Sequence, residues 1–315
     1  MKYRDEYLNV VSSYPQIIRD QLNRIFKTVL EIVEPENLRS LVLIGSAARN
    51  ELTIEHKPDN IIVHSDYEFI IVIDRAPPAL LKSLRIRFSE LEREFKNSSP
   101  LFSIDYGIIR YQKLFVTPRT LWSFEFATKG VCVWGEDIRD CLPTVTSRNI
   151  DLGNLMWLAP VRLWSFTKNM PLDCYRGEAS RESVLVKYIL LARNLLDVVT
   201  ILLPHKGIMI AGYKERQAAF ENSSLVSVGK LGCRSQLLRE MLEFKLSPSL
   251  EKNFSELNPN LLVLIYAELF QTIDSNLSWD YDPSSLPAFI DKLKRGNLFR
   301  HSFLKEVRWL ANSFN

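Results

Sequence analysis

Two acidic residues one position apart open an apolar strand, and their types and spacing could do chemistry. Asp66 and Glu68 stand at the start of the segment HSDYEFIIVID, just ahead of the apolar run Phe69 to Ile73. Acids at positions i and i+2 of a strand point to the same face. Two like charges side by side repel, and burying them is costly unless a cation lies between them. The spacing therefore predicts a divalent metal ion at this end of the strand.

A small-residue turn lies about twenty residues earlier in the chain. Gly45-Ser46 ends the apolar run Leu41 to Ile44 and leads into Ala-Ala-Arg, which favours a helix. A strand-to-helix turn of this kind can present backbone N–H groups to phosphate oxygens. Arg49 follows one helical turn later and is either a phosphate ligand or a solvated surface residue. A phosphate-binding turn next to a metal site predicts metal-assisted chemistry on a nucleotide.

A third acid, Asp105, lies inside another apolar strand, predicted over Leu101 to Arg110. Three carboxylates around a small volume can hold two Mg²⁺ ions about 3.5–4 Å apart. Magnesium suits such a site because it prefers carboxylate, phosphate and water oxygens in an octahedral arrangement.

The surrounding elements must bring these residues together. The apolar periodicity predicts one helix over residues 5–34, ended by Pro35, and a helix over Ala79–Lys96. Strands are predicted at 38–44, 61–64, 68–73, 101–110 and 131–134, with a loop or hairpin at about 52–63. After residue 148 only helical patterns follow, among them 152–168, 181–203, 213–222, 235–244, 259–273, 286–293 and 301–314. We therefore expect an α+β domain over 1–147, a mixed sheet flanked by helices, followed by an all-helical bundle over 148–315.

The order of these motifs resembles the polymerase-β-type nucleotidyltransferase superfamily over roughly residues 36–140. The match consists of Gly-Ser, then acid-x-acid on a strand, then a lone acid on a later strand. The later segment KGVCVWGEDI and the helical second half are similar to antibiotic and minimal nucleotidyltransferases. Two features depart from the pattern: Glu68 stands where Asp is commoner, and the insertion at about 52–63 lengthens the approach to Asp66.

The resemblance implies a role for each matched residue. Gly45 and Ser46 would hold the β- and γ-phosphates. Asp66 and Glu68 would bridge two Mg²⁺ ions, and Asp105 would complete the metal site beside the nucleophile. Two further residues are candidate nucleotide ligands. Ser65 either orients Asp66 or contacts phosphate, or it merely begins the strand. Lys187 on the helix 181–203 is similar to a phosphate-binding lysine of the helical domain in several relatives. Lys187 shares a narrow polar stripe with Asn194 and Asp197, which we expect to face solvent or line a cleft.

The activity implied is that of an enzyme that transfers an NMP from an NTP, with ATP favoured, to an acceptor hydroxyl and releases pyrophosphate. A small-molecule acceptor suits the size and charge of the chain. Synthesis of a nucleotide second messenger is the main alternative, and a non-catalytic nucleotide-binding module belongs to a different class.

The composition limits the possible partners. The 315 residues include 40 Lys and Arg against 37 Asp and Glu, a net charge of +3, and 46% are hydrophobic. This balance does not favour extended nucleic acid or a membrane surface as a partner. The four cysteines and four histidines are scattered, which argues against a disulfide framework or a zinc site. We expect a cytoplasmic protein and leave homo-oligomerisation open.

Overall fold

The computed structural model describes residues 3–58, 60–95, 99–176, 178–223, 234–251 and 259–273. The chain divides into two compact units, Met1–Ile150 and Asp151–Asn315. The division falls three residues after the boundary expected from the sequence. The helices predicted at 286–293 and 301–314 lie outside the described residues.

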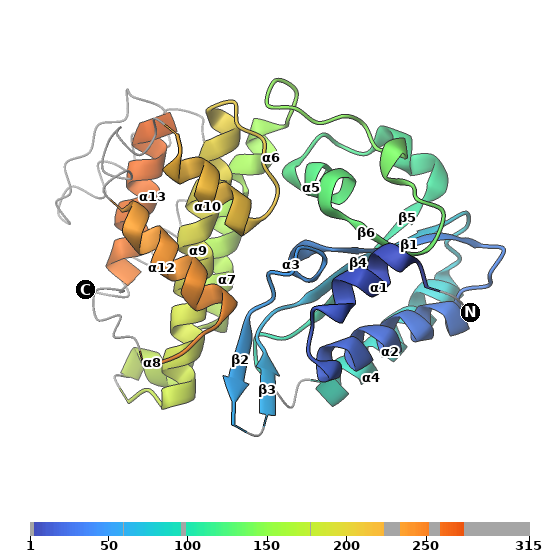
Figure 1. Ribbon diagram of the computed structural model, residues 1–315, viewed down its shortest axis with the longest axis horizontal. Coiled ribbons are helices and arrows are strands. Elements are labelled where there is room, and N and C mark those ends of the chain that lie inside the picture. The colour runs from blue at the N-terminus through green and yellow to red at the C-terminus, as the bar shows by residue number, and fades with distance from the viewer. Residues whose placement is uncertain are drawn as a thin grey trace. The chain divides into compact units, whose positions relative to one another are not determined.

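The first unit is an α+β domain built on a four-stranded mixed sheet (Figure 1). Its elements are α1 (Asp5–Ser12), α2 (Gln16–Ile32), β1 (Leu38–Ile44), α3 (Gly45–Ala48), β2 (Ile54–Lys57), β3 (Asn60–Val63), β4 (Tyr67–Ile73), α4 (Pro78–Phe95), β5 (Ile104–Arg110), the 3₁₀ helix η2 (Tyr111–Val116), α5 (Leu121–Lys129), β6 (Val131–Gly135) and the 3₁₀ helix η3 (Arg139–Cys141). The strand order is β5-β4-β1-β6, and β2 pairs with β3 in a separate hairpin. The parallel pair β4–β5 is joined through α4, as parallel strands require a crossover connection. The mixed sheet and the hairpin in the insertion agree with the sequence.

Alternate residues of the central strands enter two separate cores, which define two faces of the sheet. The α2 face packs against α1, α2 and α4, and its strand residues include Leu41, Leu43, Phe69, Ile71 and Ile73. The α5 face packs against η2, α5 and η3, and its strand residues are Val42, Ile44, Ile70 and Val72. In Figure 1, α2 and α4 lie on one side of the sheet and α5 on the other. This period-two alternation is what a strand with both faces covered requires.

One predicted helix proves to be two. The segment 5–34 forms α1 and α2, separated at Ser13 to Pro15. Proline removes a backbone donor and clashes with the preceding turn, so Pro15 stands just before α2 instead of inside a continuous helix. The prediction of one helix was wrong because the apolar periodicity continues in step across the break.

In the described part of the second unit every element is a helix: α6 (Leu152–Met156), α7 (Leu158–Asn169), α8 (Leu172–Arg176), α9 (Arg181–His205), α10 (Tyr213–Glu221), α12 (Ser235–Leu246) and α13 (Pro259–Ile273). The long helix α9 is the centre of this unit. It packs against α7, α10, α12 and α13, and nearly every residue from Leu185 to Pro204 is buried. Asp151 caps α6 by accepting a hydrogen bond from the Asn154 N–H at 3.0 Å.

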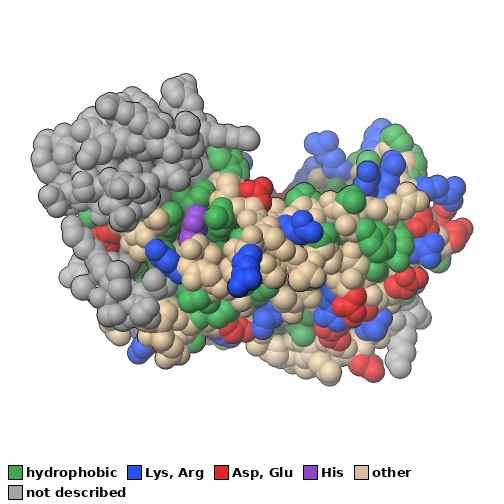
Figure 2. Space-filling model, turned by 90° about the horizontal axis from the view of Figure 1, so that it is seen from above, with side chains coloured by type: hydrophobic (Ala, Val, Ile, Leu, Met, Phe, Trp, Pro, Cys, Tyr) green, Lys and Arg blue, Asp and Glu red, His purple; other side chains and the backbone are tan. Residues whose placement is uncertain are grey.

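The surface carries charges of both signs. On the face shown in Figure 2, Lys and Arg side chains lie among Asp and Glu, and hydrophobic side chains appear singly or in small groups. Among the described residues, no helix is both long and apolar enough to cross a membrane.

Candidate functional site

The register of the sheet places Glu68 beside Asp105. The two residues are paired across the parallel strands β4 and β5, whose backbones run about 4.8 Å apart. Glu68 alternates with Ile70 and Val72, so its side chain belongs to the α5 face. Asp105 and Gly107 are two residues apart on β5 and so share one face of the sheet. This is the α5 face, because a Cβ added at Gly107 would lie 2.7 Å from Cδ1 of Ile70, which packs there. Two carboxylates thus stand next to each other at one end of the sheet, Glu68 half-buried and Asp105 exposed.

The Gly45 backbone lies directly against the Glu68 side chain. Ile44, the last residue of β1, pairs with Glu68, and Gly45 follows with a positive φ of +67°. A Cβ added at Gly45 would lie 1.7 Å from Glu68 Oε2, an impossible contact. Any side chain at position 45 would therefore meet both a disfavoured backbone conformation and the Glu68 carboxylate. The structure brings Gly45, Glu68 and Asp105 together from three strand ends.

Ser46 occupies the next position and holds a buried hydroxyl group. The residue is 7% exposed, and in the part of the chain that the structure describes its Oγ has no hydrogen-bond partner. Buried hydroxyl groups are normally paired, so an orphan of this kind needs an explanation. The turn itself is well anchored, because Tyr14 OH donates to the Ala47 carbonyl at 2.8 Å and the Glu51 N–H donates to the Ser46 carbonyl at 2.9 Å.

Arg49 is not a solvated surface residue. Its side chain is 8% exposed and forms ion pairs with Glu51 at 3.0 Å and with Glu125 of α5 at 3.2 Å. The Glu51 side chain is fully buried. Arg49 thereby ties the segment after α3 to α5, on the side of the sheet where Glu68 and Asp105 lie.

Asp66 and Ser65 precede β4. Asp66 is half-buried and stands one residue before the first residue of the strand. Ser65 is buried, and its Oγ accepts a hydrogen bond from the Thr53 N–H at 2.8 Å. The Ser65 hydroxyl therefore joins the start of β4 to the hairpin segment.

The three carboxylates are not gathered into one ligand set. Among the described residues, no group of three or more His, Cys, Asp or Glu side chains could hold a metal ion. Glu68 and Asp105 are adjacent, and carboxylate oxygens reachable from solvent are the donors that Mg²⁺ prefers. The fit to magnesium is therefore good in donor chemistry and incomplete in number, because the three acids do not form a described group of three.

Lys187 belongs to the second unit. It is half-buried on α9, and its Nζ lies 5.8 Å from the centroid of the Tyr188 ring. The polar stripe expected to include Lys187 does not exist as a surface feature, because Asn194 and Asp197 are buried inside this unit. Asp197 accepts hydrogen bonds from Arg162 and from Tyr213, the latter at 3.0 Å. The stripe was misread because a few polar residues that pair inside a helical bundle have the same spacing as a solvated edge.

The sequence analysis missed His64 as a residue of structural interest. His64 is 4% exposed, and both of its ring nitrogens have partners. A signal was present in the sequence, because His64 directly follows the apolar strand residues Ile61 to Val63 and precedes Ser-Asp. Burial at that position would have required hydrogen-bond partners for the ring.

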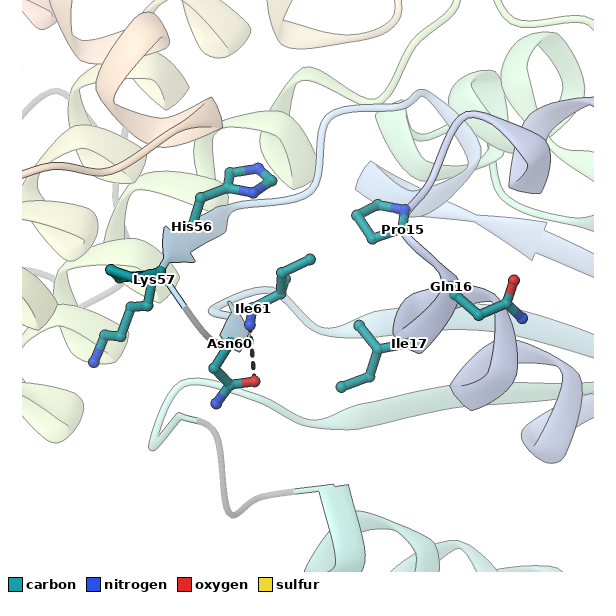
Figure 3. Close-up of a pocket in the computed structure, with 8 residues that line it drawn as sticks. Pro15, Gln16, Ile17, His56, Lys57, Asn60 and Ile61 are labelled. Atoms are coloured by element: carbon teal, nitrogen blue, oxygen red, sulfur yellow. Dashed lines mark hydrogen bonds between the residues drawn. The ribbon is translucent and has the colours of Figure 1, made fainter.

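A separate hollow of about 490 Å³ lies between the start of α2 and the tip of the β2–β3 hairpin (Figure 3). Ile17 from α2 and His56, Lys57 and Ile61 from the hairpin are among its lining residues. None of the residues predicted to bind nucleotide or metal lines it. The hollow is therefore a different surface from the strand ends that carry Glu68 and Asp105.

No protein-family model matches this chain, and no curated protein matches its sequence.

Proposed function

We propose that the protein is a magnesium-dependent nucleotidyltransferase that moves an NMP from an NTP to an acceptor hydroxyl, most simply on a small molecule. One observation carries the proposal. The adjacent residues Glu68 and Asp105 lie at the end of the sheet where Gly45 forms a turn with a positive φ. Ser46, the residue after Gly45, has a buried hydroxyl group without a described partner. A strand end that combines two acids with an orphan donor is difficult to explain by stability alone.

Each residue has a defined role in this reaction. Gly45 and Ser46 would hold the β- and γ-phosphates through the backbone N–H groups of the turn, and Ser46 Oγ would donate a hydrogen bond to a phosphate oxygen. Asp66, Glu68 and Asp105 would hold Mg²⁺, which supplies charge neutralisation and acidifies the attacking hydroxyl. Asp105, which is exposed, would take the hydroxyl proton as the acceptor oxygen bonds to the α-phosphorus. The bond between the α-phosphorus and its bridging oxygen to the β-phosphate breaks, and pyrophosphate leaves.

A non-catalytic nucleotide-binding module is the second candidate, and the arrangement of the acids favours it. Among the described residues, the acids do not assemble into a group of three that could hold a metal ion. A protein that only binds a nucleotide would need the turn and Ser46 but would not need three metal-binding carboxylates in place.

The test uses labelled NTPs. The full-length protein is incubated with each α-labelled NTP and Mg²⁺, with and without a panel of hydroxyl-bearing small molecules, and the products are resolved by chromatography. Label transferred to an added acceptor supports the proposal, and a nucleotide product formed without acceptor supports second-messenger synthesis. NTP binding by calorimetry without turnover supports the binding module. Absence of both binding and turnover contradicts all three.

Substitutions assign any activity to the site. Asp105→Asn and Glu68→Gln keep side-chain size while removing charge, and each should lower kcat by about 100-fold or more. Glu31→Gln is the matched control, because Glu31 is an exposed residue of α2 whose side chain is 59% accessible. Equal turnover in all three variants would place the activity elsewhere.

A further inference from the structure

His64 lies at the junction of three segments that approach the candidate site. It follows β3 and stands two residues before Asp66. Its backbone N–H donates to the Thr53 carbonyl at 2.9 Å, which extends the pairing of the hairpin beyond β2 and β3. The chain therefore runs from this closed hairpin directly into Ser65, Asp66 and the start of β4.

The His64 ring reaches the other two segments. Its Nε2 lies 3.1 Å from Glu55 Oε2 on β2, and its Nδ1 lies 2.8 Å from Ser99 Oγ in the turn that precedes β5. Ser99 is itself buried, and its Oγ accepts from the Leu101 N–H at 3.1 Å. The ring thus links the hairpin to the approach to β5, the strand that carries Asp105.

The partners define the direction of these hydrogen bonds. Burial lowers the pKa of the His64 imidazole, and each ring nitrogen lies beside one partner. The Glu55 carboxylate accepts only, so Nε2 carries the proton and donates to it. Nδ1 pairs with the Ser99 hydroxyl, which also accepts from the Leu101 N–H. Each donor in this relay has an acceptor, so the three segments are joined in one specific arrangement.

A second link runs between the same segments on the backbone. The Tyr67 N–H donates to the Ser103 carbonyl at 3.0 Å, one residue after Asp66 and two before Asp105. The His64–Ser99 contact joins the same two stretches of chain, three residues before Tyr67 on one and four residues before Ser103 on the other. The relay therefore holds the two acid-bearing stretches together at the point where the strand ladder begins.

We propose that His64 is a positioning residue that sets the placement of Asp66 relative to Asp105 through its hydrogen bonds to Glu55 and Ser99. The inference rests on the proposed function for its catalytic consequence. Its structural part, that the ring orders the stretches 64–68 and 99–106, does not depend on that function.

The first arm of the test measures local order by hydrogen–deuterium exchange. In His64→Ala, peptides covering 64–68 and 99–106 should exchange about tenfold faster, which corresponds to the loss of one or two buried hydrogen bonds, while β1 and β6 remain unchanged. His56→Ala is the matched control, because His56 is an exposed histidine of the same hairpin. A folded His64→Ala variant with wild-type exchange in both stretches overturns the proposal.

The second arm separates hydrogen bonding from packing. His64→Leu fills the space without polar contacts, whereas the side-chain oxygen of His64→Asn can accept from Ser99. We expect the Mg²⁺ concentration for half-maximal turnover to rise about tenfold and kcat to fall in the Leu variant, with KM for the NTP changed by less than about threefold. His64→Asn should recover part of the loss. Wild-type values in the Leu variant, or a loss that only tracks the folded fraction, contradict a positioning role.

The two arms keep the two proposals distinguishable. If the wild-type protein shows no Mg²⁺-dependent turnover while the exchange pattern appears as expected, the proposed function fails and the positioning of the acid-bearing stretches stands. If turnover is present and the folded His64→Ala variant exchanges as the wild type does, the positioning proposal fails and the proposed function stands.

Discussion

The substitution Gly45→Ala tests the geometry of the site without requiring any activity. An alanine at φ +67° costs about 1–2 kcal/mol because its Cβ crowds the following carbonyl. The new Cβ would also lie 1.7 Å from Glu68 Oε2 and 2.7 Å from Glu68 Cδ, so the carboxylate must rotate away. Forcing that rotation adds about 0.5–1.5 kcal/mol. The contact with Glu68 Cβ at 3.1 Å cannot be relieved by rotation of the carboxylate end. The free energy of unfolding of the first unit should therefore fall by about 1.5–3.5 kcal/mol.

The chain provides a control that isolates the backbone contribution. Gly207 has a φ of +85° and no atom within 4 Å of an added Cβ, so Gly207→Ala meets the conformational cost alone. Urea unfolding followed by circular dichroism should give a loss of about 1–2 kcal/mol for Gly207→Ala, smaller than that for Gly45→Ala. A double-mutant cycle with Glu68→Ala then measures the side-chain contribution directly, because removing the carboxylate should reduce the cost of Gly45→Ala by about 1 kcal/mol. A cost no larger than that of Gly207→Ala, together with zero coupling to Glu68, would refute the close approach of Glu68 to the turn.

Three further predictions concern single side chains. Ser46→Ala should leave the protein as stable as the wild type or about 1 kcal/mol more stable, because it removes a buried hydroxyl without a described partner. It should also weaken NTP binding about tenfold, measured by calorimetry. A loss of stability would show that the hydroxyl is satisfied within the fold. Lys187→Ala should raise KM for the NTP about tenfold if the predicted phosphate contact exists, whereas an unchanged KM would remove Lys187 from the site. Burial lowers the pKa of His205, so below about pH 6.5 the unfolded chain binds more protons than the folded one. The free energy of unfolding should therefore decrease as the pH is lowered, by at most about 1.4 kcal/mol per pH unit for this residue. Urea unfolding at pH 7 and pH 5 should show a smaller decrease for His205→Gln than for the wild type, and equal decreases would contradict the effect of burial.

Local pattern was sufficient for most of the elements in the first unit. The strands at 38–44 and 68–73 and the hairpin within 52–63 could be predicted because their residues alternate or cluster in ways that few other structures allow. The break before α2 was missed, since the apolar spacing on both sides of Pro15 fits a single helix. The buried polar residues of α9 were misjudged for a related reason, because spacing along a helix does not say what covers each face.

Partners distant in sequence explain the misjudged side chains. The burial of Arg49 could not be predicted from local sequence because one of its partners, Glu125, lies 76 positions away. The hydrogen bonding of His64 could not be predicted because its partner Ser99 lies 35 positions away. Hydrogen bonds and ion pairs of this range depend on the packing of whole elements, which no short window of sequence contains.

The sequence by itself determined the chemical types at the site and the strands that carry them. The acids Asp66, Glu68 and Asp105 and the Gly45-Ser46 turn were all visible as interruptions of apolar runs, since charge and glycine are unusual there. Only the tertiary structure decided their neighbours: that Glu68 pairs with Asp105, that its carboxylate covers Gly45, and that the three acids are not gathered together. The physical reason is that register is a long-range property. A shift of one residue between β4 and β5 would leave every local pattern intact and place the two carboxylates on opposite faces of the sheet.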